Sequence, residues 1–198
     1  AELASMIEGV RGVAAIEVNV SCPNVEGGLE FAQSPDLAAE VTGRVKERTT
    51  LPVIVKLSPN VTDIAAVAAA VVSAGADALT LVNTLIGMTI DQQTARPVLG
   101  AKRGGVSGPA LKPVALAAVY RVYEAVRVPI IGVGGITTGE DVLEFLMAGA
   151  TAVQVGTANF ADPQAAWQVL RDLTGLLRRR RIASLRDCVG IAHDSPTN

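Results

Sequence analysis

Residues 129–155 read PIIGVGGITTGEDVLEFLMAGATAVQV, and this stretch decides the fold. An apolar run leads into a glycine-rich turn, and the segment TGED at residues 138–141 then resembles a helix capping box. The helical pattern ends near Gly149, and a second apolar run begins at Ala152. A strand, a helix and a second strand in this order predict a βαβ unit, in which the two strands are parallel and the helix covers one face.

The same alternation recurs along the whole chain. Five short apolar runs predict β-strands, and a helical pattern follows each of them: residues 15–20, 53–57, 78–82, 129–132 and 152–155. Repeated strand–helix units favour an α/β protein with a parallel sheet. The interval between the third and fourth runs is the longest, and it contains an insertion at residues 83–111 that is rich in Gly, Pro and Thr. A loop of that length is usually functional or disordered.

Local signals mark where the helices begin. Ser34 and Pro35 predict a capped helix start, and Thr62 is the expected cap of the next helix. A third helical pattern covers residues 113–126. The last long helix is expected to start at residues 162–163 and to carry one apolar face formed by Trp167, Leu170 and Leu173.

Two architectures fit these units, a (β/α)8 barrel and an open doubly wound sheet. No Gly-x-Gly-x-x-Gly fingerprint follows the first strand. Glycines instead follow the last two strands, and phosphate sites in barrels form after strands seven and eight. We therefore expect residues 1–198 to form a single domain, a partial TIM barrel in which strands four to eight are present and the three N-terminal βα units are missing. The capless helical start at residues 1–7 fits this count.

The composition narrows the class of protein. Of the 198 residues, 49% are hydrophobic and 18% are charged, the formal net charge is −2 and the mean hydropathy is +0.39. This small charge gives no electrostatic basis for binding nucleic acid or an anionic membrane. Two cysteines make no disulfide framework, and neither a signal peptide nor an apolar run of about 20 residues is present. A cytoplasmic protein is expected.

Histidine and metal chemistry are discounted. His193 is the only histidine, and it begins a polar tail at residues 193–198 that we expect to be disordered. No Cys–His pair is then available, and two cysteines with one histidine make no recognisable metal site. Cys188 follows an apparent helix and is expected to be structural.

The most reactive candidate is Cys22, within the segment NVSCPN at residues 19–24. It follows a predicted strand, and α/β proteins build their active sites at the carboxyl ends of strands. A thiol between two carboxamide side chains can act as a proton shuttle or as a nucleophile. A buried cysteine before an ordinary Pro-Asn turn is the other interpretation that these residues allow.

Polar residues end two further strands. Lys56 lies in an otherwise apolar strand and should meet an anion or an electron-rich ligand, because an unpaired buried charge is costly. A lysine whose ammonium reaches solvent at the rim of the sheet is the alternative. Asn83 and Thr84 suit a flat heterocycle with several donors and acceptors, or else only an Asx turn.

Two consecutive glycine loops, at Gly134-Gly135 and Gly156-Thr157, favour a phosphorylated ligand. A residue without a Cβ lets the backbone approach a phosphate closely, and the helix that begins near Thr138 adds the positive end of its dipole. A single loop of this kind would be only a tight turn between strand and helix.

Six segments together resemble the flavin-containing dihydroorotate dehydrogenases of pyrimidine (UMP) biosynthesis. They occur in the order that the family shows and cover nearly the whole chain: EVNVSCPNVEGG at 17–28, VKLSPNVTD at 55–63, NTLIGM at 83–88, GGVSGPA at 104–110, GVGGI at 132–136 and AVQVGT at 152–157. The resemblance implies a (β/α)8 barrel with FMN at the carboxyl ends of the strands, and oxidation of (S)-dihydroorotate to orotate.

The resemblance also implies a role for each candidate. Cys22 would be the base that removes a proton from C5 of dihydroorotate, while the hydride on C6 goes to N5 of the flavin. Lys56 would lie beside the N1/O2 edge of the flavin, and Val82 would pack on it. The pyrimidine would be bound by Asn19, Asn24, Asn83 and Thr84, with Asn19 also facing the flavin. FMN would be bound by Gly108, Gly134, Gly135, Gly156 and Thr157, the last four at its phosphate.

Within the family, a cysteine at position 22 points to the soluble class rather than the quinone-using class. The segments VEGG at 25–28 and NTLIGM at 83–88 resemble the NAD-linked subgroup. That subgroup implies a homodimer of catalytic subunits and a partner subunit that carries FAD and a 2Fe-2S cluster and passes electrons to NAD. The fumarate-using subgroup and a dihydropyrimidine dehydrogenase-type module are the alternatives, and an inactive truncated fragment is the alternative without catalysis.

Overall fold

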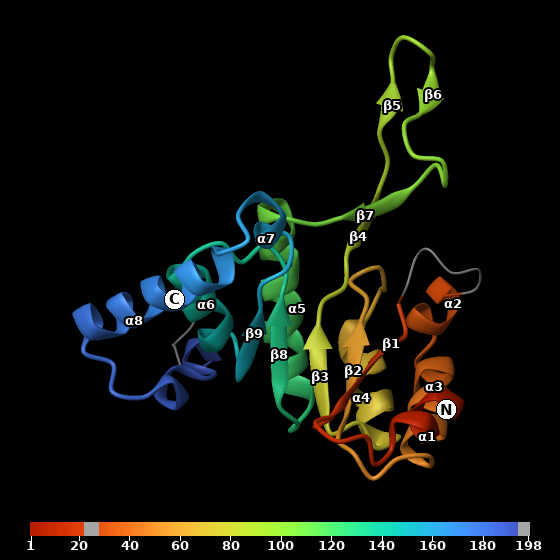
Figure 1. Cartoon of the computed structure of the whole chain (residues 1–198), viewed down its shortest axis with the longest axis horizontal. Coiled ribbons are helices and arrows are strands. Elements are labelled where there is room, and N and C mark those ends of the chain that lie inside the picture. Colours follow the sequence, from red (N-terminus) through yellow and green to blue (C-terminus); the bar gives the residue numbers. More distant parts are fainter. Residues whose placement is uncertain (22–27, 194–198) are drawn as a thin grey trace.

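The computed structural model describes residues 1–21 and 28–193 of the chain, with residues 28–30 as backbone. Its main feature is a parallel sheet with the strand order β1-β2-β3-β8-β9. These strands are β1 (Ile16–Asn19), β2 (Val53–Leu57), β3 (Ala78–Leu81), β8 (Ile130–Val133) and β9 (Ala152–Gln154). The five strands predicted from the apolar runs are confirmed, as is their parallel arrangement (Figure 1).

Helices follow the strands as predicted. The α-helices are α1 (Glu2–Ile7), α2 (Gly28–Gln33), α3 (Pro35–Lys46), α4 (Ile64–Ser73), α5 (Lys112–Ala125), α6 (Gly139–Met147), α7 (Ala158–Ala161) and α8 (Ala165–Arg180). Short 3-10 helices are η1 (Pro109–Leu111), η2 (Leu185–Cys188) and η3 (Ile191–His193). Among the described residues, no helix combines the length and the apolar character needed to cross a bilayer.

Two of the three predicted helix caps are confirmed. The Ser34 hydroxyl accepts from Leu37 N at 3.3 Å at the start of α3. Thr138 and Asp141 form a complete capping box at the start of α6. The prediction for α4 was wrong by one residue: Asp63, not Thr62, is the cap, because its carboxylate accepts from two N–H groups of the first turn.

The sheet is strongly curved. Its outer strands β1 and β9 are four strand spacings apart, which would separate them by about 19 Å if the sheet were flat. Nevertheless Gln154 Nε2 of β9 donates to Glu17 Oε2 of β1 at 2.9 Å. Two side chains can meet over that span only when the sheet curls toward the face from which they project. The sheet therefore has an inner, concave face and an outer face.

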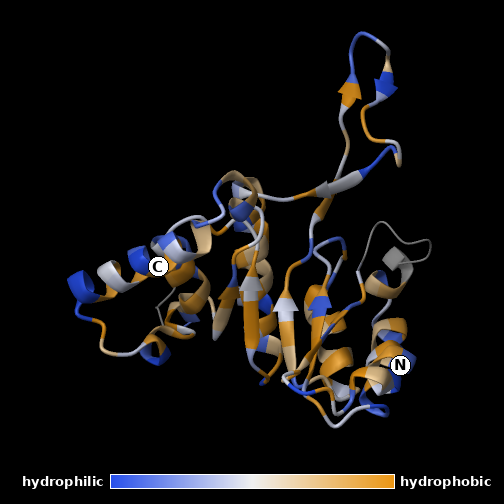
Figure 2. Ribbon diagram, in the orientation of Figure 1, coloured by the Kyte–Doolittle hydropathy of each residue, from blue (hydrophilic) through white to orange (hydrophobic). Residues whose placement is uncertain are grey.

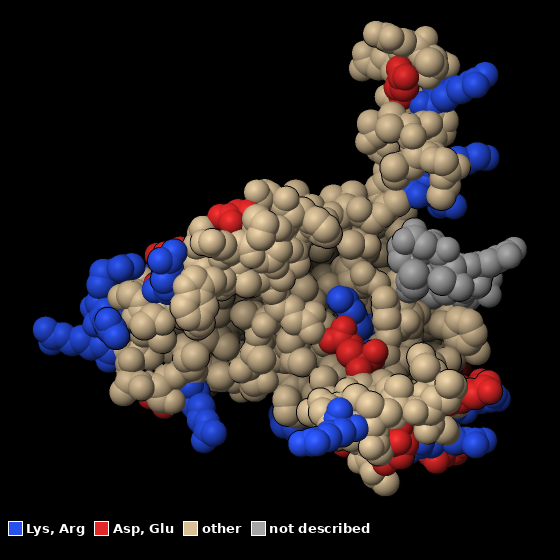
Figure 3. All heavy atoms as spheres, in the orientation of Figure 1, with Lys and Arg blue, Asp and Glu red and all other residues tan. Residues whose placement is uncertain are grey.

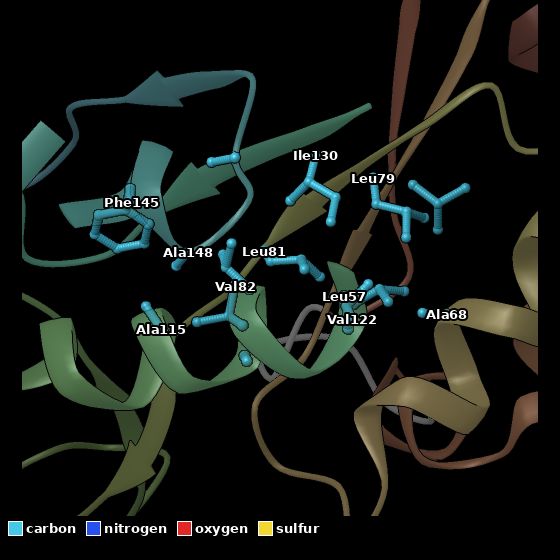
Figure 4. Close-up of a cluster of buried hydrophobic side chains, with 14 of the residues drawn as sticks. Leu57, Ala68, Leu79, Leu81, Val82, Ala115, Val122, Ile130, Phe145 and Ala148 are labelled. Carbon is cyan, nitrogen blue, oxygen red and sulfur yellow. The ribbon is translucent and has the colours of Figure 1, made fainter. Parts of the chain in front are cut away.

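The hydrophobic core lies between the outer face and the helices. Along β2, buried and half-buried residues alternate. Leu57 therefore packs toward the helices, while Lys56 lies on the inner face of the sheet. Leu79 and Leu81 of β3 extend this layer, and Val122 of α5 and Phe145 of α6 cover it from the helical side (Figure 4). The apolar colouring of the strands and of the helices behind them shows the same layer (Figure 2).

The insertion forms an arm of two antiparallel hairpins that projects away from the sheet (Figure 1). β4 (Leu85–Gly87) pairs with β7 (Gly104–Val106), and beyond them β5 (Ile90–Asp91) pairs with β6 (Arg96–Pro97). The arm begins and ends beside the carboxyl end of β3, and its apolar side chains include the exposed Met88, Ile90 and Val98.

Two expectations for the C-terminal region need correction. Trp167 and Leu170 of α8 are exposed, at 61% and 50%, so only Leu173 of the expected apolar face packs on the core. His193, expected in a disordered tail, lies in η3 and stacks on Tyr120 with the ring centroids 3.8 Å apart. Its Nε2 also lies 3.1 Å from the carbonyl oxygen of Ala148, so contacts with α5 and α6 order this segment. Residues 194–198 lie outside the described part of the chain.

Candidate functional site

A pocket of about 510 Å³ opens at the carboxyl ends of the strands. Its volume is in the range of ligand sites, about 300–1,000 Å³. Its lining includes most of the residues that the sequence singled out: Lys56, Val82, Asn83, Thr84, Gly108, Gly134, Gly135, Gly156 and Thr157. The structure therefore brings together side chains and loops that follow four different strands, as expected where parallel strands end at one edge.

Gly135 allows the loop after β8 to lie against the start of α5. Its φ is +72°, and a Cβ there would lie 2.8 Å from the carbonyl oxygen of Gly108 and 2.9 Å from atoms of Lys112. No side chain fits this space in that conformation. Among the described residues, none accepts a hydrogen bond from the backbone N–H of Gly134, Gly135, Gly156 or Thr157. All four residues line the same pocket, and a set of N–H groups without acceptors suits an anionic group.

A partly buried ion pair links this loop to the neighbouring helix. Lys112 Nζ, at the start of α5, lies 2.6 Å from Asp141 Oδ1 and 2.9 Å from Glu144 Oε2 of α6. The other oxygen, Asp141 Oδ2, accepts from the N–H groups of Thr137 and Thr138 at 2.8 and 2.9 Å. One carboxylate therefore caps α6 and anchors α5 at once.

The pKa values of this pair reflect these contacts. Burial raises the pKa of Asp141, but Lys112 and the donors of Thr137 and Thr138 outweigh burial and lower the pKa from 3.8 to about 2. The hydrogen bonds to Asp141 and Glu144 raise the pKa of Lys112 above its ordinary value. Both groups are consequently charged at neutral pH.

Lys56 lines the pocket from β2. Its side chain is 21% exposed, and its Nζ lies 3.9 Å from Glu17 Oε1 of β1. Space-filling atoms show basic and acidic side chains side by side in the hollow of the molecule (Figure 3). The lysine near the end of an apolar strand is thus paired with a carboxylate that the sequence reasoning did not single out.

Asn83 connects the end of β3 to the end of β1. Its Nδ2 lies 2.8 Å from Ser21 Oγ, 3.0 Å from the Ser21 carbonyl oxygen and 3.2 Å from Asn19 Oδ1. Its Oδ1 accepts from Thr84 N at 2.9 Å. Asn19 is not among the residues that line the pocket, and its Oδ1 accepts from Asn83 Nδ2 and from Ser21 Oγ. The amide therefore fixes the backbone immediately before residue 22.

Of the two cysteines, the structure describes Cys188 but not Cys22. Cys22 and Asn24 lie outside the described residues, so their predicted roles stay predictions; the chain is placed up to Ser21, which is buried. Cys188 is 2% exposed, and burial, with a smaller contribution from Asp187, raises the pKa of its thiol. A neutral buried thiol agrees with the structural role expected for Cys188.

Sequence reasoning missed Asn60 as well as Glu17, Lys112 and Asp141. Asn60 Nδ2 donates to the Thr84 carbonyl at 2.9 Å, and its Oδ1 accepts from Ile86 N at 2.9 Å, which holds the base of the hairpin arm over the end of β2. The segment LSPN after the strand offered a signal, because an amide at a strand end is placed to hold a neighbouring loop.

A family model described as dihydroorotate dehydrogenase matches residues 1–177. Three relatives carry the name "Dihydroorotate dehydrogenase B (NAD(+)), catalytic subunit". The protein of Citrifermentans bemidjiense is 55% identical over 96% of this chain and 62% of its own length. The protein of Desulforamulus reducens is 54% identical over 97% of this chain and 64% of its own length. The protein of Geobacillus kaustophilus is 54% identical over 96% of this chain and 61% of its own length.

A solved structure, that of Eimeria tenella DHODH in complex with ferulenol, is similar with a TM-score of 0.80 and 25% identity. The match covers 98% of this chain and 58% of that one. The chain spans about three fifths of the length of the curated relatives it matches.

Proposed function

Since the chain belongs to the dihydroorotate dehydrogenase family, we propose that it provides the FMN site and the catalytic strand ends of an enzyme that oxidises (S)-dihydroorotate to orotate in pyrimidine biosynthesis. The observation that carries the proposal is the joint presence, in one pocket, of Lys56, Asn83 and the two glycine loops. Each of these comes from a different strand end, so the fold rather than local sequence brings them together.

The pocket suits FMN on two independent grounds. The unused N–H donors of the two glycine loops match a phosphate, and the remaining lining is largely apolar, as an isoalloxazine ring requires. In this proposal Gly134, Gly135, Gly156 and Thr157 hold the phosphate of FMN, and Gly108 is a further FMN-binding position. Val82 packs on the ring, and Lys56 lies at its electron-rich edge. Bound FMN would supply a hydride acceptor.

The residues of this chain would act on the substrate and its protons. In the proposed mechanism the Cys22 thiolate accepts the proton from C5 of dihydroorotate as the hydride leaves C6, so that the C5–C6 single bond becomes a double bond. Asn24, Asn83 and Thr84 would hold the pyrimidine, and Asn19, which is absent from the pocket lining, would contribute through its hydrogen bond with Asn83. The contact of Asn83 with the Ser21 carbonyl supports this assignment, because it fixes the chain next to residue 22.

The relatives' names support the NAD-linked class. Each is called a catalytic subunit, a term that entails a further subunit. We therefore propose a homodimer of catalytic subunits that passes electrons to NAD through a partner subunit carrying FAD and a 2Fe-2S cluster.

The five parallel strands would correspond to strands four to eight of a (β/α)8 barrel. Three observations support this: the curvature of the sheet, the glycine loops after its last two strands, and the exposed apolar side chains of Phe160, Trp167 and Leu170 near its β9 edge. In a full-length relative, three further strands would lie between β9 and β1 and cover this surface.

The proposal is tested with the full-length protein that contains this chain. The purified protein should be yellow, and anaerobic addition of dihydroorotate should bleach its flavin absorbance, whereas dihydrouracil should not. The variant Cys22→Ala should bind FMN equally well but bleach at least about a hundredfold more slowly, within the usual contribution of a general base. A colourless protein, or equal bleaching of the variant, would contradict the proposal.

A further inference from the structure

Glu17 is a carboxylate on the inner face of the sheet that takes no part in the proposed binding of FMN or substrate. It projects from β1, and two donors converge on its Oε2: Thr80 Oγ1 of β3 at 2.7 Å and Gln154 Nε2 of β9 at 2.9 Å. β1, β3 and β9 alternate in the sheet order. Side chains from alternate strands form one layer of a barrel interior, so these three residues make a polar layer below the pocket.

This layer orients the second oxygen of the carboxylate. Because Thr80 is fully buried and both hydrogen bonds end on Oε2, the position of Glu17 is determined by two strands besides its own. Its Oε1 then faces Lys56 Nζ at 3.9 Å from the neighbouring strand β2. That distance permits charge attraction but exceeds the length of a hydrogen bond.

Lys56 therefore has a counter-charge and keeps its donors. Among the described residues its Nζ makes the ion pair with Glu17 and no hydrogen bond. Lys56 lines the pocket, and attraction to Glu17 holds its ammonium back toward β1. A ligand edge that gains electrons beside Lys56 gains less stabilisation than an unpaired lysine would give it.

We propose that Glu17 is a positioning residue that holds Lys56 and, through it, lowers the reduction potential of the bound flavin. The inference rests on the proposed function, because it needs a flavin against Lys56. In this proposal the carboxylate touches neither substrate nor cofactor; it acts by holding the ammonium toward β1 and so limiting its approach to the flavin. The position of the Glu17 carboxylate is maintained by hydrogen bonds that join β1, β3 and β9, and not by a single loop.

The test is the midpoint potential of the flavin in the full-length protein, measured by equilibration with a reference dye during anaerobic reduction. Glu17→Gln keeps the shape and removes the charge, so the potential should shift to more positive values. Lys56→Met should shift it to more negative values. In the Lys56→Met background, Glu17→Gln should have a much smaller effect than in the wild type, as expected of two coupled groups.

A matched control separates the effect of the Glu17 charge on the flavin potential from the effect of disturbing the contacts around Glu17. Thr80→Val removes one hydrogen bond to the same carboxylate but leaves its charge, so the potential should change far less than in Glu17→Gln. If Glu17→Gln does not fold, Glu17→Asp withdraws the carboxylate from Lys56 and should give a smaller shift in the same direction.

Three results would overturn the inference. If Glu17→Gln binds flavin and its midpoint potential is unchanged, the carboxylate has no effect on the flavin. If Glu17→Gln shifts the potential equally with and without Lys56, the carboxylate does not act through that lysine. In either case the proposed function stands, since the wild-type flavin is bound and reduced by dihydroorotate. A wild-type protein that binds no flavin overturns both together.

Discussion

Lys112 and Asp141 join the N-terminal ends of two helices that meet beside the candidate phosphate site. The ammonium at the start of α5 lies 2.6 Å from the carboxylate that caps α6. An anion site bordered by Asp141 and Glu144 would be unfavourable if both carboxylates were uncompensated. The lysine offsets one of the two negative charges, and Asp141 also binds the N–H groups of Thr137 and Thr138 beside the glycine loop.

Lys112→Met should weaken the binding of FMN more than the binding of riboflavin. Removing the ammonium leaves two negative charges near the phosphate, which we expect to cost about 1–2 kcal/mol, or about tenfold in Kd. Riboflavin lacks the phosphate, so its Kd should hardly change. Fluorescence titration of the full-length protein with both flavins measures the ratio, and an equal loss for both would show that the ion pair is only structural.

Asp141→Asn should destabilise the protein at neutral pH but much less in acid. The pKa of Asp141 in the fold is about 2, below its ordinary value of 3.8, so its stabilising contribution is present above about pH 4 and is lost as the pH falls toward 2. The difference in pKa corresponds to about 2 kcal/mol at pH 7. Urea unfolding of wild type and variant at pH 7 and pH 3 compares the full contribution with about half of it, and a difference independent of pH would contradict this account.

Gly135→Ala should lower the melting temperature, whereas Gly156→Ala should not. A Cβ at Gly135 meets the Gly108 carbonyl oxygen at 2.8 Å in a backbone with φ +72°, while a Cβ at Gly156 has nothing within 4 Å. We expect a loss of about 1–3 kcal/mol for the first change. Thermal unfolding followed by circular dichroism compares the two variants, and equal melting temperatures would show that the loop can relax.

Asn83→Asp should impair turnover more than flavin binding. The change replaces the donor that reaches the Ser21 carbonyl with an acceptor, so the chain before residue 22 loses its support. We expect at least about a tenfold fall in kcat/KM for dihydroorotate, with FMN affinity nearly unchanged. Gln93→Glu makes the same kind of change on the exposed arm and should leave both quantities unaltered.

The predictable parts of this molecule depend on neighbours in sequence. The apolar run at residues 53–57, the Ser34 cap and the capping box at the start of α6 can each be recognised within a few residues, and each is confirmed. The glycine loops could be placed at strand ends for the same reason, since a parallel strand followed by a helix determines which edge a loop occupies.

The unpredicted parts depend on curvature and on separate elements. The contact between Glu17 and Gln154 joins residues 137 positions apart, and it exists only because the sheet curls. The exposure of Trp167 likewise depends on what packs against α8, not on its apolar period. The cap of α4 is Asp63 and not the adjacent Thr62. The sequence could not decide between them because Thr and Asp are both common cap residues.

The two outer strands of the sheet have a practical consequence for handling the protein. Among the described residues β1 pairs only with β2, and β9 only with β8. Each therefore presents a row of free backbone donors and acceptors, and the β9 side is accompanied by Phe160 at 92% exposure. Bare parallel edges beside apolar surface are templates for adding strands from other molecules. A polypeptide of residues 1–198 expressed by itself should thus self-associate into insoluble material, and co-expression with the strands of the proposed barrel that precede β1 should restore solubility.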